Sequence, residues 1–318
     1  MNPIRVAVVG AGAFGRNHMR VLKECARAEL AGVVDTDKER AAAAASQFAC
    51  PEYASLHELR GKVDAAVIAV PTSLHSEVGC ELLESGIDAL VEKPIAADRV
   101  EARKLVETAR EHGRILQIGH LERFNPAVVA LKKAAKLPLF FEIHRMSLFS
   151  PRSLDVDVVL DLMIHDLDIV LDLVGMEPDE IRGAGISVLS EKVDIANVRL
   201  AFPTGCIANL TASRVSTERV RKLRVFQPSQ YISLDYSRQE AAAFAVRDGQ
   251  QIDFRMLPVE KGEPLRAEIE HFLDCVEERR APQVAGEDGL RALESALTIL
   301  DKIEEHRQLV ARQLKSLT

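Results

Sequence analysis

The sequence predicts an α/β protein in which a doubly wound parallel sheet is followed by an α+β domain with a large, mostly antiparallel open sheet. Through about residue 120, short and continuously apolar runs alternate with helical patterns, as in buried parallel strands. Beyond that point, strand patterns follow one another with short turns, which is typical of antiparallel neighbours. The 318 residues suffice for two domains, and we expect them at 1–120 and 121–318.

The first domain is predicted from apolar runs that each read as a strand. These strands are expected at 4–10, 28–35, 64–70, 88–94 and 114–120. Helical patterns separate them at 15–24, 36–48, 73–86 and 97–112. The runs lack period-two alternation, so both faces of the sheet should be covered by helices.

The second domain is predicted to begin with a helix at 126–136 and a strand at 140–147. An aspartate-rich helix follows at 155–175, and successive strands fill most of 179–258. Turn signals stand at 203–205, 228–230 and 247–250, and two helices, at 264–279 and 286–312, end the pattern.

Composition narrows the classes of function. The net charge is −7 without a basic cluster, which argues against nucleic acid as a partner. No apolar run approaches the roughly 20 residues of a membrane span. The five cysteines are scattered and form no C-x-x-C pair, which indicates a reducing cytoplasm and no metal site. We therefore expect a cytoplasmic protein that acts on small molecules.

A glycine pattern follows the first predicted strand and opens the first helix. Gly10, Gly12 and Gly15 form G-x-G-x-x-G, with Ala13 and Phe14 between the last two. In this context the pattern is typical of dinucleotide binding: Gly10 allows the tight turn, Gly12 admits the pyrophosphate and Gly15 lets the helix pack on the strand. A glycine turn in a fold without nucleotide is the alternative. We expect all five residues at the cofactor.

Asp35 ends the second predicted strand, 20 residues beyond Gly15. A carboxylate at this place can accept hydrogen bonds from the adenosine ribose and would repel a 2′-phosphate. The cofactor predicted is therefore NAD, which is favoured over NADP.

Lys93 lies in "VEKPIA", at the carboxyl end of a predicted parallel strand, where open α/β sheets place their ligands. Its ammonium could donate to a substrate hydroxyl or to the cofactor ribose. Pro94 restricts the turn by fixing its own φ. We place Glu92 and Lys93 at the cofactor, while an isolated lysine could equally be a surface charge.

The aspartate-rich helix has a narrow polar stripe. At about 100° per residue, Asp157, Asp161, His165, Asp168 and Asp172 fall within about 80°. Such a stripe either lies at the protein surface or faces a polar cleft.

Together these motifs resemble the glucose–fructose oxidoreductase / inositol dehydrogenase / MocA (Gfo/Idh/MocA) family. The glycine turn, "EKP" and the Asp161–His165 pair in "DLMIHDLD" occur in the family's order, and the resemblance covers essentially the whole chain. It implies a Rossmann domain followed by a domain with an open, largely antiparallel sheet. It also implies an active site between nicotinamide and that sheet, and oxidation or reduction of sugar and cyclitol carbons.

The resemblance implies a role for each matching residue. Lys93 would contact and orient the substrate, His165 would transfer the proton, and Asp161 would position the substrate or support the histidine. The polar stripe would then face the catalytic cleft. Met163 departs from the family, in which glycine is common at this place.

A second departure is "VPTSLH" (70–75), where relatives often have a proline–asparagine pair. Thr72 and His75 are expected as contacts on the nicotinamide side.

A narrower resemblance lies in "GHLERFNP" (119–126) and "FSPRSLDVDVVLDLMIHDLDIV" (149–170). These stretches are similar to the branch that acts on UDP-linked N-acetylamino sugars. Arg123, Asn125 and Arg152 are then candidate substrate contacts, the arginines for a pyrophosphate or carboxylate. An interdomain salt bridge is the alternative for Arg123.

The sequence thus predicts an NAD-dependent dehydrogenase of a sugar, with a UDP-N-acetylamino sugar as the favoured substrate. Rival substrates are a free cyclitol or hexose, and a related chemistry uses NAD transiently for glycoside cleavage. A non-catalytic NAD-binding regulator is the rival from another class, although it would not need Lys93, Asp161 and His165 together. The partly apolar outer face expected for 198–214 favours a homodimer or homotetramer.

Overall fold

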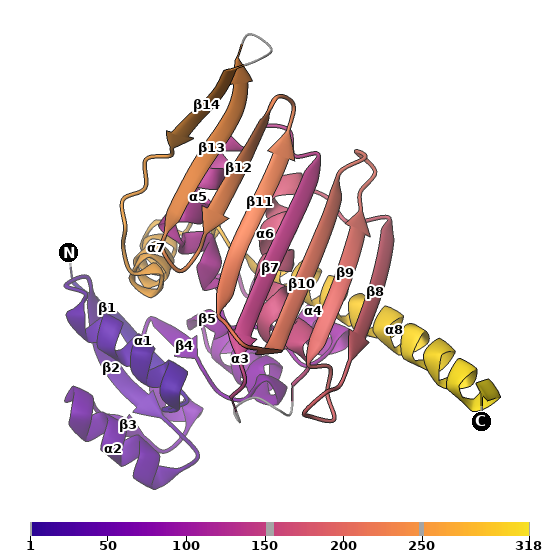
Figure 1. Ribbon diagram of the computed structural model, residues 1–318. Helices are drawn as coiled ribbons and strands as arrows, with labels where there is room; N and C mark the ends of the chain where they lie inside the picture. Colours follow the sequence, from indigo (N-terminus) through magenta and orange to yellow (C-terminus); the bar gives the residue numbers. More distant parts are fainter. Residues whose placement is uncertain (1, 151–155, 248–250, 318) are drawn as a thin grey trace. The chain divides into compact units, whose positions relative to one another are not determined.

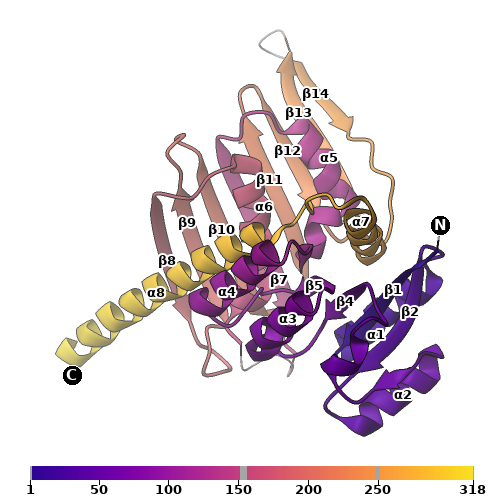
Figure 2. The same ribbon diagram turned by 180° about the vertical axis from the view of Figure 1, so that it is seen from behind.

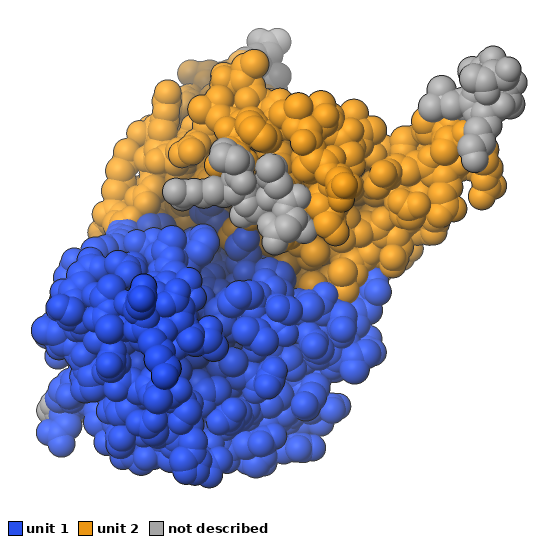
Figure 3. All heavy atoms as spheres, turned by 90° about the horizontal axis from the view of Figure 1, so that it is seen from below, with its two compact units in different colours: residues 1–124, 263–290 blue, residues 125–262, 291–318 orange. Residues whose placement is uncertain are grey.

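The chain forms two compact units in a computed structural model that describes residues 2–150, 156–247 and 251–317. Unit 1 comprises residues 1–124 and 263–290, and unit 2 comprises residues 125–262 and 291–318 (Figure 3). The first segment of unit 1 ends near the boundary that the sequence predicts at 120. Residues 263–290, which we expected in the second domain, cluster with unit 1 instead.

Unit 1 is built on a six-stranded parallel sheet in the order β3-β2-β1-β4-β5-β6 (Figure 1). The strands are β1 (Ile4–Val9), β2 (Ala28–Val34), β3 (Glu52–Tyr53), β4 (Ala65–Ile68), β5 (Asp88–Glu92) and β6 (Leu116–Gly119). The order reverses between β1 and β4, so the first domain is the predicted doubly wound sheet. Only the short β3 escaped the sequence analysis.

Helices cover both faces of this sheet. They are α1 (Ala13–Glu24), α2 (Lys38–Phe48), α3 (His75–Glu84), α4 (Arg99–Glu111) and α7 (Pro264–Glu278). Val67 of β4 belongs to the apolar core that α1 and α7 complete. Its neighbour Ile68 lies within van der Waals reach of Gly79 on α3, and successive strand residues point to opposite faces.

Helix α7 joins unit 1 from a distant part of the chain. Its residues Ile269, Phe272 and Leu273 are buried in one cluster with Met19 and Leu22 of α1. At the surface, ion pairs tie the same two regions together, from Arg27 to Asp274 and Glu277 and from Arg20 to Glu263. No local pattern encodes this partner, so the sequence could predict the helix but not its place.

Unit 2 is built on an eight-stranded sheet in the order β14-β13-β12-β11-β7-β10-β9-β8. The strands are β7 (Phe140–Leu148), β8 (Glu180–Ile186), β9 (Ile195–Ala201), β10 (Ile207–Ser216), β11 (Val220–Gln227), β12 (Gln230–Asp235), β13 (Glu240–Arg247) and β14 (Gln251–Met256). Among the described strands of this sheet, β7 and β10 pair in parallel and every other neighbouring pair is antiparallel. The predicted class of the second domain is confirmed.

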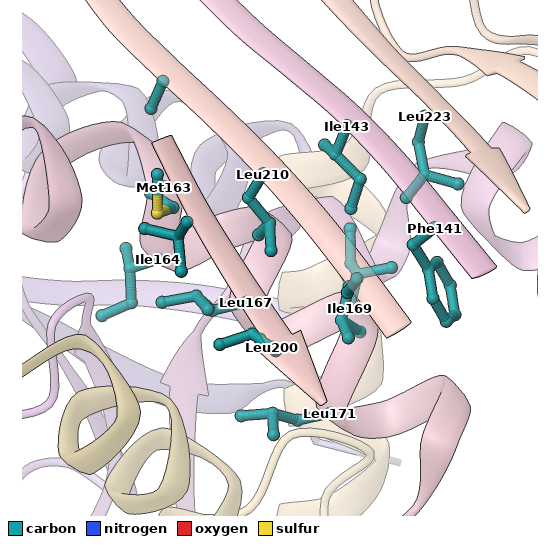
Figure 4. Packing of buried hydrophobic residues seen from close by; sticks show 14 of the residues in the cluster. Phe141, Ile143, Met163, Ile164, Leu167, Ile169, Leu171, Leu200, Leu210 and Leu223 are labelled. Atoms are coloured by element: carbon teal, nitrogen blue, oxygen red, sulfur yellow. The ribbon is translucent and has the colours of Figure 1, made fainter. Parts of the chain in front are cut away.

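One face of this sheet carries helices (Figure 2). They are α5 (Pro126–Ala134), the π-helical turn η4 (Val159–Met163), α6 (Ile164–Val174) and α8 (Gly286–Leu317). Inward side chains of the strands, such as Ile143, Leu210 and Leu223, pack with Leu167 and Ile169 of α6 (Figure 4). This apolar layer holds α6, which is the predicted catalytic helix, on the sheet.

The opposite face of the sheet bears a row of aromatic side chains in register across β7, β11, β12, β13 and β14. The row consists of Phe140, Phe226, Tyr231, Phe244 and Phe254, with neighbouring ring centroids 4.4–5.8 Å apart. Such cross-strand pairs stabilise a sheet by roughly 0.2–1 kcal/mol each. Within the described part of unit 2, no helix covers this row (Figure 1).

Candidate active site

The turn between β1 and α1 is shaped by three glycines. A Cβ at Gly15 would lie 1.8 Å from the carbonyl oxygen of Gly10, so only glycine lets α1 approach the strand this closely. Gly10 itself has a φ of +97° and lies against Ala69. Around Gly12, in contrast, nothing lies within 4 Å of a built Cβ. These contacts match the predicted roles of turn, helix packing and open approach.

A cavity of about 500 Å³ opens beside this turn. Its walls come mainly from the ends of β1, β2 and β4 and from the first turn of α1, with Arg40 from α2 and Leu56 and Leu74 from two single helical turns. The lining residues include Gly10, Gly12, Ala13, Phe14, Asp35, Thr36, Val70 and Pro71. Gly12 begins α1 without a side-chain cap, so the first amides of the helix are not occupied by a side chain. Free helix N-terminal amides favour a bound phosphate.

Asp35 is held at the rim of this cavity by four hydrogen bonds. One carboxylate oxygen accepts from the Ala11 N–H at 2.7 Å and from Arg40 Nε at 2.8 Å. The other accepts from the Asp37 N–H at 2.9 Å and from Arg40 Nη2 at 2.8 Å. Partial burial works to raise the pKa of Asp35, but the bonds from Arg40 and the two amides outweigh it and lower the pKa. The carboxylate therefore stays charged and fixed.

This cavity fits an adenine dinucleotide on chemical grounds. It combines open space over Gly12, uncapped helix amides and an anchored carboxylate. Gly12 and the first turn of α1 would hold the pyrophosphate, and Asp35 would hold the ribose hydroxyls. Arg40 is a cation that the sequence analysis missed, although it stands five residues after Asp35. It partly offsets the repulsion of a 2′-phosphate that Asp35 alone would exert.

Lys93 follows β5 directly, at the carboxyl edge of the sheet, and the Lys93–Pro94 peptide is cis. Behind it, the His75 ring is 1% exposed. Its Nδ1 lies 2.8 Å from the Pro94 carbonyl oxygen and its Nε2 lies 3.0 Å from that of Val70. Burial lowers the pKa of His75. The ring thus links the end of β4 to the Lys93 turn, and its predicted contact with nicotinamide gives way to this structural role.

Glu92, the residue before Lys93, points into the interior of unit 1. His18 Nε2 of α1 donates to its Oε1 at 2.7 Å. A Cβ on Gly119 would lie 3.1 Å from its Oε2, so the glycine leaves the carboxylate room. Burial works to raise the pKa of Glu92, but the bond and charge of His18 and the charge of Lys93 lower it overall. Glu92 therefore supports Lys93 from behind rather than lining the cavity.

Asp161 and His165 lie where η4 passes into α6, and both are half-buried. A π-turn within a helix often marks a functional site, because it re-aims the side chains that follow. The helix begins only after Asp157, whose Oδ1 accepts from the Val193 N–H at 2.8 Å. The helix expected at 155–175 is thus shorter, and its first residue, 155, lies outside the described part of the chain.

The rest of the polar stripe does not act as one surface. Asp172 pairs with Lys132 at 2.7 Å, and Asp168 is buried. Asp166, which does not belong to the stripe, is buried in an ion pair with Arg145 Nε at 2.8 Å and accepts from the Tyr236 hydroxyl at 3.1 Å. Of the five predicted residues, Asp161 and His165 remain as candidates for chemistry.

Two of the predicted substrate contacts, Arg123 and Asn125, have partners within the protein. Arg123 is nearly buried and lies 3.6 Å from Asp288, within unit 1. Asn125 caps α5 through the Ala127 N–H and donates to the Tyr236 carbonyl, so both of its polar ends serve unit 2. Arg152 lies outside the described residues. Thr72 is half-buried in a single helical turn after β4 and stays a prediction.

Comparison with known proteins agrees with these features. Residues 4–120 match the family described as "Oxidoreductase family, NAD-binding Rossmann fold", and residues 144–227 match the GFO/IDH/MocA C-terminal domain. UDP-N-acetylglucosamine 3-dehydrogenase of Acidithiobacillus ferrooxidans is 37% identical over 311 residues, which cover 96% of this chain and 99% of that protein. The chain belongs to the Gfo/Idh/MocA oxidoreductase family.

Solved structures of the family share the fold. That of the Acidithiobacillus ferrooxidans enzyme has a TM-score of 0.90 at 36% identity, and the match covers 96% of this chain and 99% of that one. Inositol 2-dehydrogenase of Rhizobium meliloti is 26% identical over 96% of this chain and 98% of its own length. As an oxidoreductase of this family, the protein uses NAD, which confirms the cofactor predicted from the glycine turn.

Two further findings concern the described residues alone. None of their helices is long and apolar enough to span a membrane. All five cysteines are free thiols.

Asp35→Ser tests the cofactor assignment. We expect NAD binding to weaken about tenfold, because a charged hydrogen-bond acceptor is lost, and NADP binding to strengthen, because Arg40 is released from its partner. Dissociation constants for both cofactors, measured by titration calorimetry, check this. Unchanged constants for the two cofactors would contradict the assignment of Asp35.

Proposed function

We propose that the protein oxidises a secondary hydroxyl of a UDP-linked N-acetylamino sugar. The observation that carries this proposal is the 37% identity to a UDP-N-acetylglucosamine 3-dehydrogenase over nearly the full length of both chains. It is supported by the presence of Lys93, Asp161 and His165 in this chain. A regulator that only binds NAD has no need for all three.

The reaction removes a hydride from the carbinol carbon and a proton from its hydroxyl, which leaves a ketone. Bound NAD supplies the hydride acceptor. We assign the proton to His165, since an imidazole titrates near neutral pH and can serve as a general base. Asp161, one turn earlier on the helix, is assigned to holding the substrate or the imidazole in place.

Lys93 is assigned to the reacting hydroxyl. Its position after β5 is set by the β5–β6 pairing, by the His75 link and by Glu92 behind it. An ammonium held in this way can orient the hydroxyl and stabilise negative charge as it develops on the oxygen. The protein thus supplies position and electrostatics for the hydride step.

Inositol is the second candidate substrate, because inositol 2-dehydrogenase of Rhizobium meliloti matches along the whole chain at lower identity. Both candidates offer a secondary alcohol on a six-membered ring, so the same catalytic residues would serve them. The UDP group separates the two and makes the choice testable.

His165→Asn tests the assignment of the base. The parent should reduce NAD when UDP-N-acetylglucosamine is added, followed as absorbance at the NADH band, and should reduce it more slowly with inositol. In the variant we expect turnover to fall on the order of 10²-fold or more. The acidic limb of the rate–pH profile should flatten, while NAD binding persists.

Asp172→Asn is the matched control, because Asp172 lies on the same helix but pairs with Lys132. It should keep turnover close to that of the parent. Near-parental turnover in His165→Asn would assign the proton to another group, and a parent active on inositol alone would overturn the UDP-sugar substrate.

We also propose that two copies of the chain associate through the aromatic row on the sheet of unit 2. Phe254 ends this row on the edge strand β14, where Ile252, Phe254 and Met256 share one face and are 74%, 56% and 53% exposed. An exposed apolar band on a sheet face, which no helix of the described part of its unit covers, favours association. An in-register row can meet the same row of a second copy about a twofold axis.

Phe244→Glu tests this association, because it places a charge in the middle of the row. We expect the parent to sediment as a dimer or tetramer at micromolar concentration and the variant to sediment as a smaller species. Val100→Glu, at an exposed apolar residue of unit 1, is the control that should leave the mass unchanged. A parent that sediments as a monomer would refute the proposal.

A further inference from the structure

Glu268 is a carboxyl group in the middle of the apolar core of unit 1. It lies on α7 with no solvent exposure, beside Ile269 and one turn before Phe272. Neither of its carboxyl oxygens has a hydrogen-bond partner among the residues that the structure describes. A carboxylate buried without donors is strongly unfavourable, and such a group usually takes up a proton.

A second carboxyl group, that of the mostly buried Glu92, acts on Glu268 through its charge. Gln117 of β6 donates to the Glu268 backbone carbonyl at 3.2 Å, and β6 pairs with β5 so that Gly119 lies opposite Glu92. Burial and then the negative charge of Glu92 raise the pKa of Glu268 well above its ordinary value. The two groups therefore influence each other across the core.

Charged groups of the neighbouring elements also lie near α7. From α1, His18 donates to Glu92, while Arg20 pairs with Glu263 at the surface. From the turn η3 (Leu121–Phe124), which packs on α7, Arg123 faces Asp288; Glu122 is its acidic neighbour on that turn, and His120 precedes it. Glu92 is the charge that raises the pKa of Glu268.

Of two nearby carboxyl groups, the one with the poorer surroundings for charge keeps its proton. Glu92 has His18 and Lys93 beside it and a lowered pKa, whereas Glu268 has no donor. Glu268 is therefore the neutral partner. The pair carries a single negative charge, and that charge lies next to Lys93.

We propose that Glu268 is a positioning residue that acts through Glu92 on Lys93. Its uncharged carboxyl gives Glu92 a polar neighbour while keeping the pair at one negative charge, which holds the Lys93 turn without drawing the ammonium inward. A second negative charge would attract the ammonium away from a substrate hydroxyl. The kinetic part of this proposal rests on the role proposed above for Lys93.

The pH dependence follows from the raised pKa. Above the ordinary pKa of a glutamate, the unfolded chain has released this proton, while the folded chain keeps it. The folded state then binds more protons, so its stability falls as the pH rises, until the pKa of the folded state is passed. Glu268→Gln removes this dependence because the amide is neutral at every pH.

The test compares Glu268→Gln with the parent in urea unfolding between about pH 5 and about pH 9. We expect the folding equilibrium of the variant to gain on the parent by up to tenfold for each pH unit, until the native pKa is reached. Glu270→Gln is the control, because Glu270 lies exposed on the same helix, and it should follow the parent. Equal pH dependence in Glu268→Gln and the parent would overturn the neutral carboxyl.

The kinetic arm separates positioning from packing. We expect Glu268→Met, which has similar volume but no polar group, to lower kcat/KM about tenfold, because Glu92 loses a polar neighbour in the low-dielectric core. Glu268→Gln should rescue most of that loss. In the parent, the KM for the sugar should rise at alkaline pH as Glu268 becomes charged, whereas in Glu268→Gln it should not. Full activity in Glu268→Met would overturn the positioning role. The unfolding measurement requires no substrate. If the parent oxidised no sugar but Glu268→Gln still gave the expected unfolding result, only the proposed function would be refuted.

Discussion

The close approach of α1 to the end of β1 is the constraint from which the cofactor site follows. Because Gly15 has no side chain, α1 packs directly against the Gly10 carbonyl, and its uncapped first turn lies beside the cavity. The amide of Ala11, held in the same turn, fixes Asp35 at the end of the next strand. One steric contact thus places both the phosphate-binding amides and the ribose-binding carboxylate.

Buried polar contacts likewise fix the elements that carry the catalytic candidates. Lys93 stands on a turn whose back is held by His75 and by Glu92, which itself bonds to His18. In unit 2, the helix that carries His165 is anchored to the sheet by the Asp166–Arg145 ion pair. Each pair is costly to desolvate. These contacts fix the orientation of the Lys93 turn and of the helix that carries His165.

Local sequence patterns predicted the helices and strands, whereas long-range packing determines where they lie and which side chains they bring together. The glycine turn and the places of Asp35 and Lys93 could be predicted because these places follow from strand ends and short spacings. The helix α7 was predicted but its place was not, since its partner α1 lies 242 residues away in the sequence at the Arg266–Glu24 contact. Glu268 had left a signal, a single acid on an apolar helical stripe, but its partner Glu92 is visible only in three dimensions. Similarly, two aspartates of the stripe have unrelated partners that periodicity cannot reveal, the Val193 amide for Asp157 and Lys132 for Asp172.

The central claim is that a carbinol hydrogen of the sugar passes to the nicotinamide. The most direct measurement uses UDP-N-acetylglucosamine deuterated at the carbon to be oxidised, with the reduced cofactor analysed by mass spectrometry. The account predicts that the reduced nicotinamide gains one deuterium and that turnover slows when the hydride step limits the rate. Reduced cofactor without deuterium, formed from this labelled sugar, would contradict it.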